Sequence, residues 1–104
     1  MELTRDADKI ICIIYKYFLQ KRNEGYSKSE SKSFDADFLQ KSNELMSWNP
    51  QDIMDTLLEI GRKGLVRIYV DGGFMLTDSG IIYMENRFKN GFLEVVDFIS
   101  KFIP

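Results

Sequence analysis

The first apolar pattern of the chain has the period of a helix. Between residues 4 and 22 the apolar side chains recur every three to four positions, which predicts one helix with a buried stripe. Thr4 suits the N-cap position of this helix. Ile13 does not fit the stripe because it shares the face of Lys9 and Lys16, so either another element covers it or it is exposed. The stripe consists of Ala7, Ile10, Ile11, Ile14, Tyr17 and Phe18.

The next stretch has a weaker pattern. Residues 23–33 have no apolar period and are rich in Ser, Gly, Lys and Glu, which predicts a flexible loop. A second helix is predicted over residues 35–46, although Ser42 and Asn43 interrupt its apolar face. The segment from Lys21 to Lys32 holds four basic residues against two acidic ones, which makes it a basic segment of the chain.

The third helix has the strongest boundary signals. Asn49 is a suitable N-cap, Pro50 takes the first helical position, and Gly64 ends the helix. Together with the second helix it predicts a helix-turn-helix over residues 35–64. The alternating run LVRIYV, the turn at 71–73 and the run FMLT then predict a two-stranded β-ribbon over residues 65–77.

The C-terminal part is predicted to be helical over residues 78–103, with a break at Asn90 and Gly91. Eight of the last thirteen residues are apolar, in the order FLEVVDFISKFIP. A small domain has limited interior in which to bury so many apolar side chains. At 104 residues, the whole chain (1–104) is predicted to be one domain with a mainly α (α+β) fold.

Composition excludes several classes of function. The chain has no histidine and one cysteine, which argues against zinc sites and against Ser-His or Cys-His catalysis. It has no glycine-rich phosphate-binding motif, so we expect no enzyme activity, no cofactor and no metal. It also has no long apolar run and begins with the polar MELTRDADK, so we expect no membrane association and a cytoplasmic location.

Two junctions of the chain resemble the winged helix-turn-helix superfamily. They are NPQDIMDTLLEIGRKGLV, where the third helix meets the ribbon, and FMLTDSGIIYMEN, where the ribbon meets the next helix. The second junction resembles the exit from the wing in MarR-like and PadR-like regulators, which Leu76, Thr77, Gly80 and Tyr83 match. In length and C-terminal helix the chain is most similar to the small YjcQ-like proteins. The resemblance implies a three-helix core, a two-stranded β-wing and C-terminal helices.

The resemblance also implies binding of double-stranded DNA by a transcriptional regulator, with the third helix in the major groove. Two properties oppose this function: the net charge is −2, and Asp52, Asp55 and Glu59 lie on the outward side of that helix. The alternative is a winged helix that binds a protein through its acidic third helix or its apolar C-terminal helix. A basic surface gathered beside the third helix would favour DNA, and an acidic one would favour protein. The candidate DNA-binding residues are Gln51, Asp55, Thr56, Arg62 and Lys63 of the third helix, with Lys41, Lys28 and Lys32 as phosphate anchors.

The apolar C-terminal helix predicts a homodimer. We expect Phe92, Val96, Ile99 and Ile103 to pack against the first helix, and the remaining apolar flank to join Ile13 in a seam between two copies. The candidate interface residues are Ile13, Phe92, Val95, Val96, Ile99 and Phe102.

Overall fold

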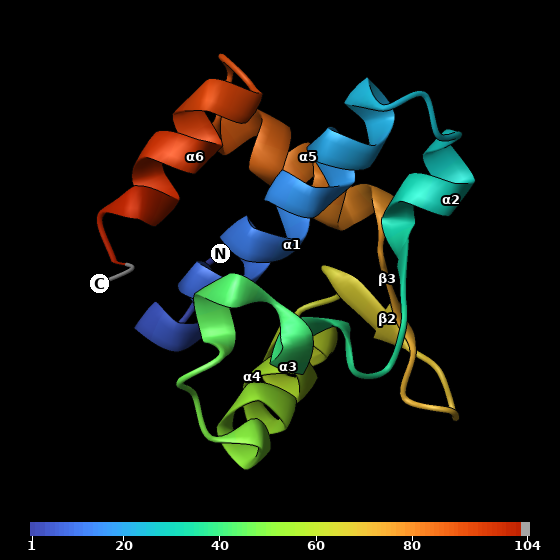
Figure 1. Ribbon diagram of the computed structural model, residues 1–104, viewed down its shortest axis with the longest axis vertical. Coiled ribbons are helices and arrows are strands. Elements are labelled where there is room, and N and C mark those ends of the chain that lie inside the picture. The colour runs from blue at the N-terminus through green and yellow to red at the C-terminus, as the bar shows by residue number, and fades with distance from the viewer. Residues whose placement is uncertain (103–104) are drawn as a thin grey trace.

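The helix α1 (Arg5–Asn23) lies at the centre of the computed structural model, which describes residues 1–102 (Figure 1). Its N-cap is Thr4, whose hydroxyl accepts a hydrogen bond from the backbone N–H of Ala7. Four other helices pack against α1, so it is buried on more than one face. Ile13 has no exposed surface, and the expectation that it contributes to a seam between two copies is therefore wrong.

Helices make up most of the described chain, and three short strands form one antiparallel sheet, which confirms a mainly α member of the α+β class. The sheet has the strand order β1-β3-β2. The elements after α1 are α2 (Lys28–Lys32), β1 (Ser33–Phe34), α3 (Phe38–Lys41), the 3-10 helix η1 (Asn43–Leu45), α4 (Pro50–Arg62), β2 (Val66–Ile68), β3 (Phe74–Leu76), α5 (Asp78–Arg87) and α6 (Phe92–Ser100).

The prediction of a flexible loop over residues 23–33 is wrong in its second half. Ser27 and Glu30 form a capping box, in which each side chain bonds the backbone N–H of the other residue. This box starts α2, and the buried Ser31 donates its hydroxyl to the carbonyl of Ser27. The chain then enters β1, which pairs Phe34 with Phe74 of β3.

The second predicted helix is shorter than the range 35–46. It consists of α3 and η1, and the two are separated by the extended backbone of Ser42. The hydroxyl of Ser42 donates to the carbonyl of Leu39, which satisfies the carbonyl where the helix stops. The interruption of the apolar pattern at Ser42 and Asn43 therefore coincides with a break in the helix.

The helix α4 begins and ends where its sequence signals indicate. The side chain of Asn49 accepts from the N–H of Gln51, and Gly64 takes the positive φ of 79° that a helix end requires. The strands β2 and β3 follow and pair in register, with Arg67 opposite Met75. The β2–β3 ribbon therefore follows α4 directly, after the short connection at residues 63–65.

The start of α5 is locked against the end of α4. The backbone N–H of Thr77 donates to the carbonyl of Leu65 (3.0 Å), and its hydroxyl donates to the carbonyl of Gly64 (2.7 Å). Gly80 lies so close to this junction that a Cβ added there would be 2.3 Å from the carbonyl oxygen of Leu65. Only glycine fits this position without a shift of the backbone.

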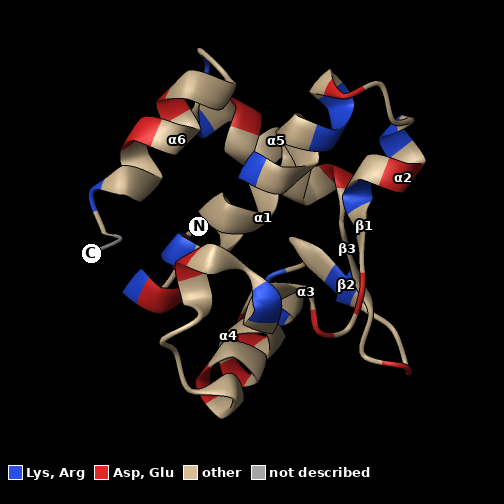
Figure 2. Cartoon of the chain, viewed as in Figure 1, with Lys and Arg blue, Asp and Glu red and all other residues tan. Residues whose placement is uncertain are grey.

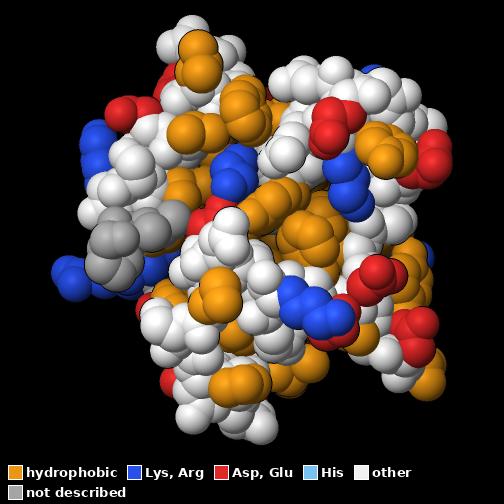
Figure 3. Space-filling view, viewed as in Figure 1, with side chains coloured by type: hydrophobic (Ala, Val, Ile, Leu, Met, Phe, Trp, Pro, Cys, Tyr) orange, Lys and Arg blue, Asp and Glu red, His pale blue; other side chains and the backbone are white. Residues whose placement is uncertain are grey.

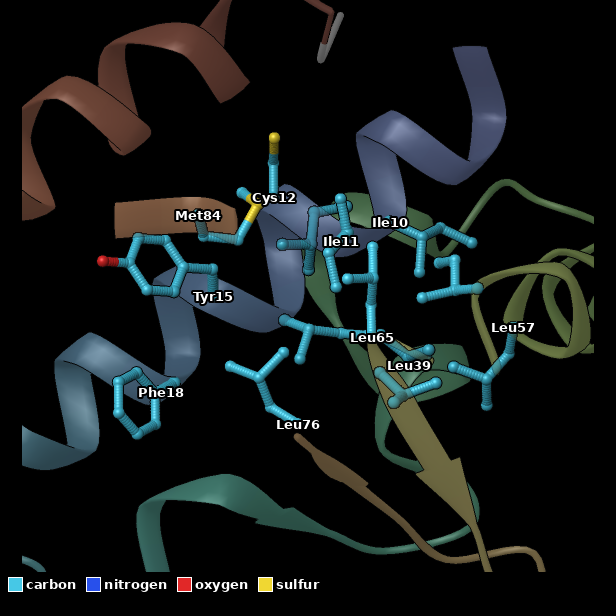
Figure 4. Packing of buried hydrophobic residues seen from close by; sticks show 14 of the residues in the cluster. Ile10, Ile11, Cys12, Tyr15, Phe18, Leu39, Leu57, Leu65, Leu76 and Met84 are labelled. Atoms are coloured by element: carbon cyan, nitrogen blue, oxygen red, sulfur yellow. The ribbon is translucent and has the colours of Figure 1, made fainter. Parts of the chain in front are cut away.

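The C-terminal helices fold back onto α1. A break at Gly91, with φ 79°, separates α5 from α6, and α6 packs along α1 with Val95 and Ile99 buried. The predicted contact of Ile103 lies outside the described residues. Figure 4 shows the resulting core, in which α1 side chains such as Ile10 and Ile11 meet apolar residues from α3, α4, β3 and α5.

Candidate functional site

The outward face of α4 is a narrow polar stripe. Ile53, Leu57 and Ile60 point into the core, which leaves the opposite side of the helix in solvent. Thr56 lies on the inward side: it is buried, and its hydroxyl donates to the carbonyl of Asp52. The expectation that Thr56 contacts DNA is therefore wrong, since the side chain faces the core. The exposed residues of α4 are Pro50, Gln51, Asp52, Asp55, Leu58 and Arg62.

The acidic character of α4 is smaller than the sequence indicates. The carboxylate of Glu59 accepts from the backbone N–H of Thr4 (3.2 Å) and from its hydroxyl (2.9 Å). Glu59 therefore binds the N-terminus of α1, where the helix dipole stabilises a negative charge. Gln51 donates to Asp55 at 2.9 Å, so this carboxylate is held along the helix.

A groove runs between the C-terminal half of α4 and the strand β2. It has a volume of about 470 Å³, and its walls are largely apolar. Gly61 lies in the wall of this groove, where an added Cβ would make an ordinary contact of 3.4 Å with Cδ1 of Ile68. We call this feature the α4–β2 groove; it is lined by Leu58, Gly61, Arg62, Gly64, Val66, Arg67, Ile68 and Thr77.

Two arginines border the α4–β2 groove without an acidic partner. Within residues 1–102, neither Arg62 nor Arg67 forms an ion pair or a side-chain hydrogen bond, and both are exposed. Leu58 adds a 42% exposed apolar side chain beside them. The sequence does not predict Arg67 as a binding residue, because its position beside α4 depends on tertiary packing.

The tip of the β2–β3 ribbon carries apolar and acidic side chains. Tyr69 is 44% exposed and Val70 is fully exposed. Asp71 accepts from the backbone N–H of Gly73 at 2.8 Å, which stabilises the turn. The tip has no cation that could contact a phosphate.

The expected phosphate anchors lie elsewhere. Lys28 and Lys32 of α2 face Asp78 at the start of α5, with nitrogen–oxygen distances of 3.8 Å and 3.5 Å. Lys41 pairs with Asp37, the N-cap residue of its own helix, at 2.7 Å. In Figure 2, α2 lies far from α4, so Lys28 and Lys32 do not form one basic surface with α4. Lys41 lies on α3, which contacts α4, but its charge is paired with Asp37. Figure 3 shows basic and acidic side chains interspersed among the apolar ones on the side of the molecule that is in view.

The candidate homodimer surface is only partly available. Val95 and Ile99 are buried against the rest of the chain. Phe102 is half-buried and packs against the core, with the ammonium group of Lys9 5.5 Å from its ring centre. Val95 and Ile99 therefore cannot form a seam, and we name the remaining exposed part of this helix the α6 flank, which consists of Phe92, Leu93 and Val96.

A polar cluster inside the fold joins α1 to η1. Glu44 accepts from the ammonium group of Lys16 and, at 2.7 Å, from the hydroxyl of Tyr17. Burial raises the pKa of Glu44, but these two hydrogen bonds outweigh burial and hold its pKa below the ordinary value. Each carboxylate oxygen of Glu44 has a partner from its own chain, which is typical of a structural group.

The single cysteine is also structural. Cys12 has no exposed surface, and burial raises the pKa of its thiol to about 12, although the charge of Arg87 lowers it. Residues 1–102 contain no group of three or more His, Cys, Asp or Glu side chains placed to hold a metal. In the same residues, no helix is both long enough and apolar enough to cross a bilayer.

Comparison with known proteins adds no family to these observations. The chain matches no family model, no curated protein and no solved structure. The function is therefore inferred from the two surfaces described above, the α4–β2 groove and the α6 flank.

Proposed function

We propose that this chain is a winged helix-turn-helix protein that binds another protein through the α4–β2 groove. The support for the fold is the arrangement of α1, α3 and α4 as a three-helix core that is followed directly by the β2–β3 ribbon. The junction at Thr77 and Gly80, on which the resemblance rests, forms tight backbone contacts in keeping with its role at the exit of a wing.

The observation that carries the proposal is the chemistry of the groove and its surroundings. A largely apolar groove with unpaired arginines and an exposed tyrosine nearby has the composition of a protein interface, in which Arg, Tyr and apolar anchors dominate. A DNA interface needs an excess of positive charge. The face formed by α4 and the ribbon has no such excess: its exposed cations are Arg62, Lys63 and Arg67, and its exposed carboxylates are Asp52, Asp55 and Asp71.

Surface variants of the full chain test this function. Wild-type protein is used to capture partners from an extract of the source cell, alongside Leu58→Glu and Arg62→Glu. The control is Ile82→Glu, which alters a 57% exposed side chain on α5. We expect a protein that is retained by the wild type and the control and lost with both groove variants. Its purified form should then bind with the same dependence, and equal binding to all four proteins would refute the proposal.

Binding of double-stranded DNA is the second candidate function. It is supported by the unpaired Arg62 and Arg67 and by the orientation of Glu59 toward α1. If Arg62, Lys63 and Arg67 contact three phosphates, affinity for a random-sequence duplex falls about 40-fold between about 50 mM and 200 mM salt. An absence of binding at the lower salt concentration, with tens of micromolar protein, would remove this candidate.

Self-association is a separate proposal that rests on the α6 flank. Leu93 is 79% exposed, and Phe92 and Val96 are half-buried, so a second copy could cover them. Sedimentation of the wild type should then give about twice the chain mass of 12.2 kDa, and Leu93→Glu should restore the single mass. A single 12.2 kDa species for the wild type at micromolar concentration would contradict the dimer.

A further inference from the structure

The strand β2 has an open edge. In the sheet order β1-β3-β2 it pairs with β3 on one side only. The carbonyl of Leu65 and the N–H of Tyr69 bond toward β3, so by the alternation of an antiparallel ladder the N–H and C=O of Ile68 point away from it. In the described part of the chain, the backbone of Ile68 forms no hydrogen bond outside the ladder. Such an unpaired edge can accept another strand.

The open edge lies beside the α4–β2 groove. Ile68 belongs to both features, since its backbone forms the edge and its side chain lines the groove with Leu58. The edge is most accessible near the ribbon tip, where Val70 is fully exposed, whereas Val66 is buried. Arg62 and Arg67 both line the groove and are exposed, which gives it a positively charged rim.

We propose that the partner bound at the α4–β2 groove contributes an extended acidic segment, which adds to β2 as a fourth strand. The inference rests on the proposed function and specifies the partner. Main-chain bonds to Ile68 would supply affinity, and an apolar side chain of the segment would fill the groove next to Leu58. Carboxylates on the flanking positions of the segment pair with Arg62 and Arg67, which have no other partner in residues 1–102.

The charge of the rim argues against a second copy of this chain as the occupant. Two β2 strands paired edge to edge would bring Arg67 of each copy onto the same short ladder, and like charges across strands are destabilising. The ribbon tip of a second copy offers only one carboxylate, that of Asp71, which already accepts from Gly73. An acidic segment of a different protein satisfies both arginines.

A designed peptide tests the inference on the full chain. The probe is a fluorescent, end-blocked peptide of alternating glutamate and valine, and its control has lysine in place of glutamate. We expect saturable binding of the acidic peptide only, weakened about two- to fivefold by Arg62→Gln and by Arg67→Gln, as for exposed ion pairs. Lys89→Gln, which alters an exposed cation on the connection between α5 and α6, should leave the affinity unchanged.

Amide hydrogen exchange distinguishes strand addition from attraction between charges. Saturation with the acidic peptide should slow exchange at Ile68 at least tenfold, because its N–H acquires a partner. The N–H of Arg67 already points toward β3 and serves as the internal control. Unchanged exchange at Ile68, equal binding of the lysine peptide, or no binding would overturn the inference.

The proposed function can survive that result. If the partner captured by the wild type still depends on Leu58 and Arg62 while the acidic peptide fails, the strand-addition inference is wrong and the protein-binding function stands. If neither partner nor peptide depends on these residues, both are wrong. Concentration-dependent dimerisation that Arg67→Gln strengthens would identify a second copy as the occupant and would also overturn the inference.

Discussion

Gly80 should be among the least replaceable residues of the chain. A Cβ at this position would lie 2.3 Å from the carbonyl oxygen of Leu65 and 2.9 Å from Cδ1 of Leu76. Restoring an ordinary contact of about 3.4 Å needs a shift of about 1 Å between α5 and the end of α4, which also stretches the two hydrogen bonds of Thr77. Gly80→Ala therefore introduces a clash, and the backbone shift that relieves it disrupts the packing and hydrogen bonds of this junction.

The expected loss can be worked out from these contacts. Overpacking costs about 1–3 kcal/mol, and one or two weakened hydrogen bonds add about 1 kcal/mol each. Alanine returns up to about 1 kcal/mol through its higher helix propensity. The free energy of unfolding should thus fall by about 1–4 kcal/mol, and the urea midpoint by about 0.5–2 M for a slope of about 2 kcal/mol/M.

Gly61→Ala is the matched control. Gly61 also lies in a helix, but its added Cβ would meet Ile68 at 3.4 Å, an ordinary contact. This variant should be unchanged or more stable by up to about 1 kcal/mol. Urea unfolding of both variants, followed by far-UV circular dichroism, measures the difference. If Gly80→Ala unfolds at or above the wild-type midpoint, the close approach at this junction is not a constraint.

Three further predictions concern the interior and α2. Glu44→Gln should lower the free energy of unfolding at neutral pH by about 1.5–3 kcal/mol, through loss of its charged bonds to Lys16 and Tyr17. Because the folded pKa of Glu44 is lowered, this difference is present above the unfolded pKa and should shrink in urea titrations as the pH falls below about 4. Cys12 should resist a thiol reagent in native protein and react once urea is added, since it is fully buried with a pKa of about 12. Ser27→Ala should cost about 1 kcal/mol and speed amide exchange in α2; unaltered exchange would show that the capping box does not hold the helix.

The sequence predicts the elements whose signals are local. The limits of α4 follow from Asn49, Pro50 and Gly64, and the ribbon follows from its alternation and its glycine turn. The helix α2 also has a local signal, since Ser27 and Glu30 have the spacing of a capping box, but the polar composition around them favours a loop. By contrast, β1 has only two residues, and its existence depends on pairing with β3, which is forty residues away.

The candidate site is less predictable because it depends on what lies opposite each residue. Ile13 shares a face with two lysines, yet it is buried because α1 is covered by several helices. The run IICIIY, which is apolar all around the helix, already indicates such a central position. The roles of Glu59 and Arg67 likewise depend on tertiary packing. Glu59 bonds Thr4 and does not face solvent freely, and Arg67 is brought beside α4.

The central position of α1 has a consequence for synthesis of the protein. Its most extensive packing is with α6, so two helices that are far apart in the sequence complete one core. On the ribosome, α1 emerges before the elements that cover it, and the face that α6 covers remains exposed until residues 92–100 follow. A nascent chain in that state exposes a continuous apolar helix, which is a typical target for chaperones and a route to aggregation. The core of this domain is thus completed only after α6 has been synthesised.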